Sequence, residues 1–187
     1  QLPIDDLRVG MNALIGKKIA IEYRGDIHCI HCGRRSKKSF SQGYCYPCFT
    51  KLPQCDTCIM SPERCHFHHG TCRDPEWGEK YCFTDHFVYL ANSSGVKVGI
   101  TRGTQLPTRW IDQGATQGLP IFRVQTRYQA GLIEDCIREH VADKTSWQKM
   151  LKGDAEPVEL VTIRDELMAK SESGLELLEQ EFGLQAL

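Results

Sequence analysis

Two cysteine pairs constrain the first part of the chain more than any other feature of the sequence. Cys29 and Cys32 are separated by two residues, as are Cys45 and Cys48, and twelve residues lie between the pairs. Each pair turns its backbone so that both thiolates face one point, and together the pairs supply the ligands of a tetrahedral Zn²⁺ site. Because four protein ligands leave no position for water, the predicted zinc is structural. A segment this small would owe its folding largely to the metal.

The next segment, CDTCIMSPERCHFHHGTCRDPEWGEKYCFTDH at residues 55–86, holds five more cysteines and several histidines. Metal binding explains them better than disulfides because the chain shows no basic segment followed by an apolar one, the pattern of a secretion signal. We therefore expect a cytoplasmic protein with two structural zinc sites and the material for a third. The preferred second site joins Cys55 and Cys58 to Cys82 and His86, a Cys-x2-Cys pair and a Cys-x3-His pair.

That grouping leaves Cys65 and Cys72, with His66 or His69, for a further site. The spacing alone does not divide these ligands. A less favoured alternative is an open, catalytic zinc held by the histidine cluster with a nearby glutamate as the base. The residues of that alternative are His66, His68 and His69, with Glu63 or Glu76.

The charge of the chain is unevenly distributed. The sequence has 23 basic and 24 acidic side chains, for a net charge of −1. Residues 153–187 hold two basic side chains, Arg164 and Lys170, against nine carboxylates, so residues 1–152 carry a net charge of +6. A cationic body predicts an anionic partner such as DNA or RNA. The alternative is a solvated acidic tail attached to an ordinary surface.

A basic loop lies between the first two cysteine pairs, in GRRSKKSFSQG. Its charges stand beside aromatic residues, a combination that suits phosphates and unstacked bases. The alternative is a solvated loop tip. The predicted nucleic-acid contacts here are Arg34, Arg35, Lys37 and Lys38, next to Phe40 and Tyr44.

The composition changes at residue 87, where cysteines almost vanish and alternating apolar runs begin. Residues 87–91 and 96–101 predict two strands joined by a Ser/Gly turn, and residues 121–127 predict a third. A helical turn is expected in PTRWIDQGA, and helices at about 128–142, 146–152 and 157–170. The predicted fold is α+β, a small antiparallel sheet covered by helices. The expected parts are a cysteine-rich zinc domain with an N-terminal strand region (1–86), the sheet module (87–152) and an acidic helical tail (153–187).

The order of residues in this second half resembles the GIY-YIG endonuclease module. Val88-Tyr89 matches the Ile-Tyr of the first motif, with Phe87 in place of its glycine. Lys97-Val98-Gly99, followed by Ile100 and Thr101, stands where the second motif is expected. The family's arginine and its metal-binding glutamate correspond to Arg109 and Glu134. The resemblance covers roughly residues 86–142 and departs from the family at Lys97, which replaces the second tyrosine.

The resemblance implies a metal-dependent hydrolysis of phosphodiester bonds. Glu134 would bind one Mg²⁺ or Mn²⁺, Arg109 would hold the phosphate and Tyr89 would orient or activate the water. Lys97 and Arg102 would line the same edge. A lysine can replace the second tyrosine as a base only if its pKa is lowered.

Each of these residues also has an ordinary structural interpretation. Tyr89 suits a strand in any protein. On their helices, Glu134 could pair with Arg138, and Arg109 with Asp112.

The whole chain is similar to an uncharacterised bacterial family that joins a cysteine-rich zinc segment to such a module. The segments that carry this similarity are GYCYPCF, CDTCIMSPERCH, GTCRDPEWGE, SSGVKVGITR and PTRWIDQGA. Three functions therefore remain: a metal-dependent nuclease docked through a zinc module, a zinc-containing nucleic-acid-binding protein without catalysis, and a zinc-structured scaffold for protein partners. None involves a membrane, because no apolar run approaches the roughly 20 residues that cross a bilayer. The sequence sets no oligomeric state.

Overall fold

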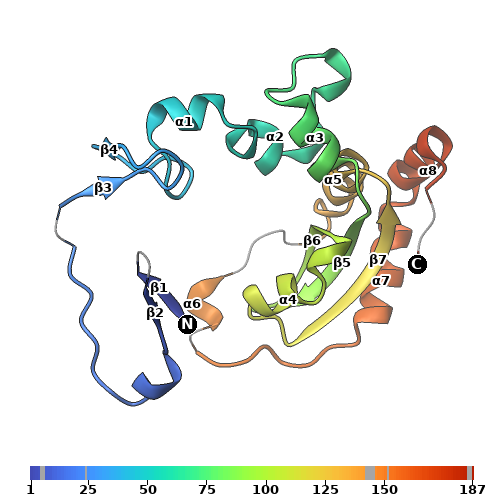
Figure 1. Ribbon diagram of the computed structural model, residues 1–187. Coiled ribbons are helices and arrows are strands. Elements are labelled where there is room, and N and C mark those ends of the chain that lie inside the picture. Colours follow the sequence, from blue (N-terminus) through green and yellow to red (C-terminus); the bar gives the residue numbers. More distant parts are fainter. Residues whose placement is uncertain (5–6, 24, 142–145, 151, 185–186) are drawn as a thin grey trace. The chain divides into compact units, whose positions relative to one another are not determined.

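The computed structural model describes residues 1–4, 7–23, 25–141, 146–150, 152–184 and 187 (Figure 1). These divide into two compact units, Gln1–Cys48 and Phe49–Leu187. The mixed α+β class with small antiparallel sheets, expected from the sequence, is confirmed. The predicted domain boundaries at 86 and 152 stay predictions.

The first unit contains two short antiparallel hairpins and little apolar core. Strands β1 (Leu2–Ile4) and β2 (Leu7–Val9) form one hairpin, a 3₁₀ turn η1 (Asn12–Leu14) follows, and β3 (Ile27–His28) pairs with β4 (Arg35–Ser36). Helix α1 (Tyr46–Lys51) spans the boundary between the units. Among the residues described in this unit, the fully buried ones are Cys29 and Cys45. An apolar core therefore does not hold the second hairpin together.

The second unit is built on a three-stranded antiparallel sheet. Its strands are β5 (His86–Asn92), β6 (Val96–Arg102) and β7 (Gln117–Val124), in the order β6-β5-β7. β5 and β6 are joined by Ser93-Ser94-Gly95, where Gly95 has φ +129°, a value that side chains disfavour. β7 is irregular near Pro120, where its register with β5 shifts, and the backbone N–H of Leu187 donates to the Ile121 carbonyl at 2.9 Å.

The core lies between this sheet and helices α5 (Arg127–Ile137), α7 (Leu160–Lys170) and α8 (Glu172–Phe182). α5 begins with a capping box, in which the Thr126 hydroxyl accepts from the Gln129 N–H while the Gln129 side chain accepts from the Thr126 N–H. Alternate side chains of the strands face the helices. The buried core residues include Val88, Leu90, Val98, Phe122, Val124, Ile133, Ile137, Leu160 and Leu167.

Helix α4 (Thr108–Asp112) follows the 3₁₀ turn η5 (Gly103–Gln105) and packs on the sheet through Trp110. The Trp110 ring lies where a side chain on Gly118 of β7 would be, only 2.6 Å from the position of an added Cβ. The same ring stands edge-on to Tyr89 of β5, with 6.0 Å between the ring centroids. Both faces of β5 are therefore covered.

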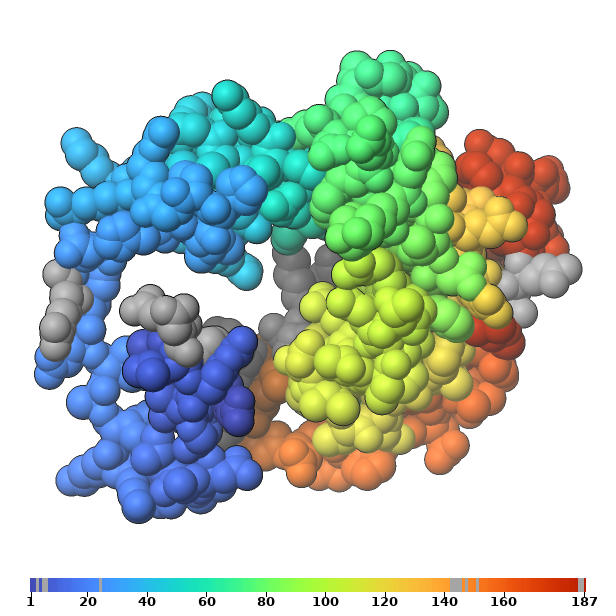
Figure 2. All heavy atoms as spheres, in the orientation of Figure 1, coloured from blue at the N-terminus to red at the C-terminus, as the bar shows by residue number. Residues whose placement is uncertain are grey.

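The cysteine-rich segment of residues 53–82 belongs to the second unit and is a series of short helical turns. These are η2 (Pro53–Cys55), α2 (Thr57–Met60), η3 (Pro62–Arg64), η4 (Phe67–His69) and α3 (Pro75–Cys82). η3 packs on α5 at Gly131, where an added Cβ would lie 2.5 Å from Pro62 Cβ and 2.7 Å from the Glu63 nitrogen. In Figure 2 the green atoms of this segment lie directly against the yellow-green atoms of the hairpin that follows.

The helices of the second half differ in extent from those expected. α5 ends at Ile137, and Ala142, the expected end, lies outside the described residues. The expected helix at 146–152 is α6 (Trp147–Met150), and the tail helix begins at Leu160 instead of 157. No helix in the described ranges combines the length and apolar character needed to cross a bilayer.

Candidate functional site

One cavity of 520 Å³ in the second unit runs along the edge strand β6. Six consecutive residues of β6 line it, so the cavity is open to side chains from both faces of the strand. Its other walls come from α4, α5 and the turns around η3. The lining residues with polar or charged side chains are Glu63, Tyr89, Lys97, Thr101, Arg102, Gln105, Arg109, Gln113, Arg127, Glu134 and Arg138.

This cavity brings together the residues that the GIY-YIG resemblance selected. Tyr89, Lys97, Arg109 and Glu134 all line it, as does Arg102. They come from β5, β6, α4 and α5, elements up to 45 residues apart in sequence. Their shared location is compatible with one site, and their individual roles stay predictions.

Tyr89 is fully buried opposite Gly99 of β6, and its ring occupies the space that a Gly99 side chain would need. Its hydroxyl donates a hydrogen bond of 2.9 Å to Gln113 Oε1. Burial raises the pKa of Tyr89 and the negative charge of Glu134 adds to it, although Arg109 and Gln113 act in the opposite direction. The phenol is protonated at neutral pH and acts as a hydrogen-bond donor.

Lys97 is 5% exposed on β6 and lines the same cavity as Arg109. Burial lowers the pKa of Lys97, and the positive charge of Arg109 lowers it further. A lowered pKa increases the fraction of neutral amine, which can accept a proton. This is the condition under which a lysine could replace the second tyrosine of the resemblance.

Glu134 lies on the face of α5 that also carries Arg127, Gly131 and Arg138. The spacing of these residues, at four, seven and eleven positions, places them on one helical stripe. Because η3 packs on Gly131, it brings a second carboxylate, Glu63, to the same cavity. Arg138 forms an ion pair with Asp135, three positions before it on α5.

The cavity is strongly cationic. Its lining has five basic side chains and two carboxylates. Because Arg138 is paired with Asp135, two formal positive charges remain in excess. Such a balance favours a phosphate or another polyanion. The carboxylates supply the oxygen ligands that Mg²⁺ or Mn²⁺ prefers, and a bound phosphate would offset the surrounding cations.

Three polar residues of this site did not emerge from the sequence: Gln105, Gln113 and Arg127. Gln113 follows Arg109 by one helical turn, a spacing that could have signalled a shared face. Arg127 donates from Nη2 to the Ile59 carbonyl at 2.7 Å, across 68 residues of sequence. No local sequence pattern indicates a contact between residues so far apart in the chain.

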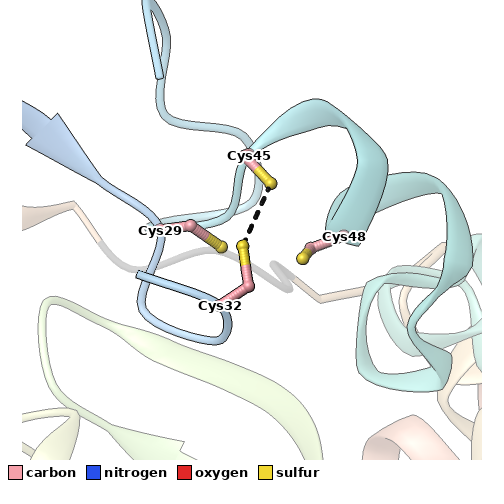
Figure 3. Close-up of side chains that lie close together, drawn as sticks. All are labelled: Cys29, Cys32, Cys45 and Cys48. Carbon is pink, nitrogen blue, oxygen red and sulfur yellow. Dashed lines mark hydrogen bonds between the residues drawn. The ribbon is translucent and has the colours of Figure 1, made fainter. Parts of the chain in front are cut away.

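A candidate metal centre lies in the first unit, at the two cysteine pairs. The sulfur atoms of Cys29, Cys32, Cys45 and Cys48 lie within 4.8 Å of one another and could hold a zinc ion. In Figure 3 they point toward a common centre, and the Cys32 and Cys45 sulfurs are 3.7 Å apart. A tetrahedron with zinc–sulfur bonds of about 2.3 Å has edges of about 3.8 Å. The donor set and its spacing therefore fit zinc.

The thiols of this centre influence one another. Burial raises the pKa of Cys29, but backbone N–H groups of Cys32, Cys45 and His31 lower it to about 6. Burial and the neighbouring thiols raise the pKa of Cys48 to about 12. Several thiolates at such short range repel one another, and a divalent cation would remove that repulsion.

A smaller group of ligand atoms, from Asp56, Cys58 and His66, lies in the second unit. In the described ranges, the preferred grouping of Cys55, Cys58, Cys82 and His86 is not gathered within the same distance, and neither is the set of Cys58, Cys65, Cys72 and Cys82. His86 is fully buried, its Nδ1–H donates to the Thr84 carbonyl at 2.6 Å, and burial lowers its pKa to about 4. The His69 and His68 rings are in tilted contact, with 4.0 Å between their centroids, and the His68 ring also contacts Tyr128.

The predicted nucleic-acid loop is exposed at all four of its basic side chains. Arg35 forms an ion pair of 2.8 Å with Asp26, which fixes its direction. Tyr23, Arg35 and Lys37 border a hollow of 510 Å³ within the first unit. The aromatic residue at this hollow is Tyr23 and not Phe40 or Tyr44, which the sequence had placed beside the basic residues. The nucleic-acid contacts of this loop stay a prediction.

In the second unit, Arg102 lies over the Tyr81 ring, 5.3 Å from its centroid, and lines the cavity along β6. This cation–π contact helps to orient the Arg102 guanidinium, which lines the cavity.

Comparison with known proteins gives one match. No curated protein and no solved structure matches the chain. The model of a family described as "Protein of unknown function (DUF2797)" matches residues 16–185. The expected relationship to an uncharacterised family is thereby confirmed, and the chain belongs to this family of proteins of unknown function.

Proposed function

We propose that the cavity along β6 binds the backbone of DNA or RNA and hydrolyses a phosphodiester bond with one Mg²⁺ or Mn²⁺ at Glu134. The observation that carries this proposal is the meeting of Tyr89, Lys97, Arg109 and Glu134 in one cavity with an excess of positive charge. These are the residues that the resemblance to the GIY-YIG module selects. The zinc centre at Cys29, Cys32, Cys45 and Cys48 would stabilise the docking module.

In this proposal the arginines hold the scissile phosphate. Arg109 offers a two-pronged contact that lysine cannot copy, and Arg102 and Arg127 add charge along the same wall. A divalent ion at Glu134 would neutralise the developing charge on the phosphoryl oxygens.

The attacking water needs a proton acceptor. Lys97, with its lowered pKa, fits that role better than Tyr89, whose pKa is raised. The water oxygen would bond to phosphorus, its proton would pass to Lys97 Nζ, and the leaving oxygen would take a proton from solvent. Tyr89, fixed by Gln113, would orient the water or the phosphate.

The direct test is cleavage of single- and double-stranded DNA and RNA with Mn²⁺ or Mg²⁺. We expect Glu134→Gln to lower the rate by at least about 10²-fold while binding persists, because the metal site is lost. Glu139→Gln is the matched control, since Glu139 is exposed near the end of α5 and outside the cavity. Equal rates for Glu134→Gln and the wild type would refute the assignment.

The second candidate is a nucleic-acid-binding protein without catalysis, favoured by the lysine at position 97. This second function predicts that the protein leaves nucleic acid uncut and that its affinity for nucleic acid falls steeply as the salt concentration rises. Replacing Lys37 and Lys38 by Gln should then lower the salt slope by about 2, and Lys170→Gln should leave it unchanged. Absence of salt-dependent binding would point to the third function, a zinc-structured scaffold for protein partners.

The zinc-binding thiols must stay reduced, which fits the cytoplasm as the place where this activity would operate.

A further inference from the structure

We propose that Cys58, Cys65, Cys72 and Cys82 form a second four-thiolate zinc site, and that Cys55, His66, His69 and His86 are not its ligands. All four cysteines line one cavity of 20 Å³ in the second unit. A space of about 10–15 Å³ on this measure accommodates one water-sized particle. The cavity therefore has room for a single ion and not for an iron–sulfur cluster.

The surroundings of this cavity leave the thiols as its main polar groups. Apart from them and Asp56, its lining consists of the apolar residues Pro53, Phe67, Trp77, Gly78 and Phe83. Gly78 of α3 has the role of a spacer, because a Cβ there would lie 3.2 Å from the Phe67 ring and 3.5 Å from Cys72 Sγ. The packing thus leaves space at the Cys72 sulfur.

Asp56 serves as a brace for this site and not as a ligand. Its Oδ1 accepts from the Thr57 N–H at 2.6 Å, and its Oδ2 lies 3.0 Å from Arg73 Nε and 3.4 Å from His66 Nε2. Asp56 thereby ties together residues next to Cys65 and Cys72 and stands two positions before Cys58 itself. Such outer contacts orient the ligands of metal sites.

Cys55 and the histidines do not line this cavity. His66 uses its second nitrogen, Nδ1, with the Thr71 hydroxyl at 2.9 Å. His86 donates from Nδ1 to the Thr84 carbonyl at 2.6 Å.

The site explains how residues 53–82 fold. This segment has no strand among its described elements, and its short turns cannot close an apolar core by themselves. The ligands come from α2, the end of η3, the loop before α3 and the end of α3. One ion would fasten all of these elements together.

The test is the zinc content of the purified, unchelated full-length chain. We expect two zinc ions per chain in the wild type, one in Cys72→Ser, and two in Cys55→Ser, His66→Ala and His86→Asn. A count of two in Cys72→Ser, or of one in any of the other three, would overturn the proposal. The metal count does not depend on nucleic-acid cleavage, so its outcome is separate from that of the proposed function.

A second measurement covers the case in which Cys72→Ser fails to fold. In Cys29→Ser/Cys32→Ser chains, which lack the first centre, one Co²⁺ should bind with the visible spectrum of four thiolate ligands. A Co²⁺ spectrum typical of three sulfur ligands and one nitrogen ligand would overturn the assignment. Iron together with inorganic sulfide in the purified protein would also overturn it, because it would indicate an iron–sulfur cluster.

Discussion

The contact between η3 and α5 makes Gly131→Ala an informative substitution, because local and tertiary effects have opposite signs there. Alanine is favoured over glycine inside a helix by about 1 kcal/mol. The added Cβ, however, would lie 2.5 to 2.8 Å from Pro62 and Glu63, mostly from backbone atoms, where ordinary contacts begin at 3.4 Å. η3 must therefore retreat by 0.6 to 0.9 Å, and overpacking of this kind costs about 1–3 kcal/mol. We expect a net loss of up to about 2 kcal/mol.

The assay is urea unfolding of the zinc-loaded protein, followed by tryptophan fluorescence. Trp77, Trp110 and Trp147 all belong to the second unit, so the signal reports on that unit. Expected is a lower midpoint with an unchanged denaturant slope. A midpoint equal to or above that of the wild type would refute the packing argument.

The matched control is Gly174→Ala in α8, made in a Cys136→Ala background. At Gly174 the close atom is Cys136 Sγ, 2.5 Å from the added Cβ, and the Cys136 Cβ is 3.9 Å away. With the sulfur removed, helix propensity alone should act, and the double variant should be more stable than Cys136→Ala by up to about 1 kcal/mol.

Three further predictions concern the site and its metals. Gly99→Ala places a Cβ 2.8 Å from the Tyr89 hydroxyl, so phosphate affinity and stability should both fall, the latter by about 1–3 kcal/mol in the same urea assay; unchanged values would contradict the cross-strand contact. If Lys97 is the base, the neutral amine forms as pH rises through its lowered pKa, so cleavage should rise with pH and Lys97→Met should abolish that rise; an identical profile in the variant would exclude this role. Zinc chelation should make amide hydrogen exchange fast in residues 29–48 while β5 stays protected; slow exchange at 29–48 after chelation would count against a structural metal.

Much of the second unit could be predicted because its signals are local. The alternation around Val88 and Leu90, with a Ser/Gly turn after it, specifies a hairpin, and the Thr126 capping box specifies the start of α5. The first cysteine cluster is equally local, since two Cys-x2-Cys pairs leave few alternatives for its geometry.

The walls of the cavity could not be predicted in the same way. Glu63 reaches it only because a missing side chain at Gly131 lets η3 approach, and Arg127 is fixed by a carbonyl 68 residues away. Tertiary packing, and no periodic pattern, creates these contacts. The arrangement of Cys58, Cys65, Cys72 and Cys82 depends on successive irregular turns, whose directions spacing does not encode.

The two outer strands of the sheet have a consequence for solubility. An open three-stranded sheet offers unpaired backbone groups to other chains, and proteins limit this hazard with charges, prolines and irregularities at their edges. β6 presents Arg102, while β7 carries Pro120, a register shift and the capping contact from Leu187. This arginine, which we assign to phosphate binding, would therefore also discourage edge-to-edge aggregation, so neutralising it should carry a cost in solubility that is separate from any loss of function.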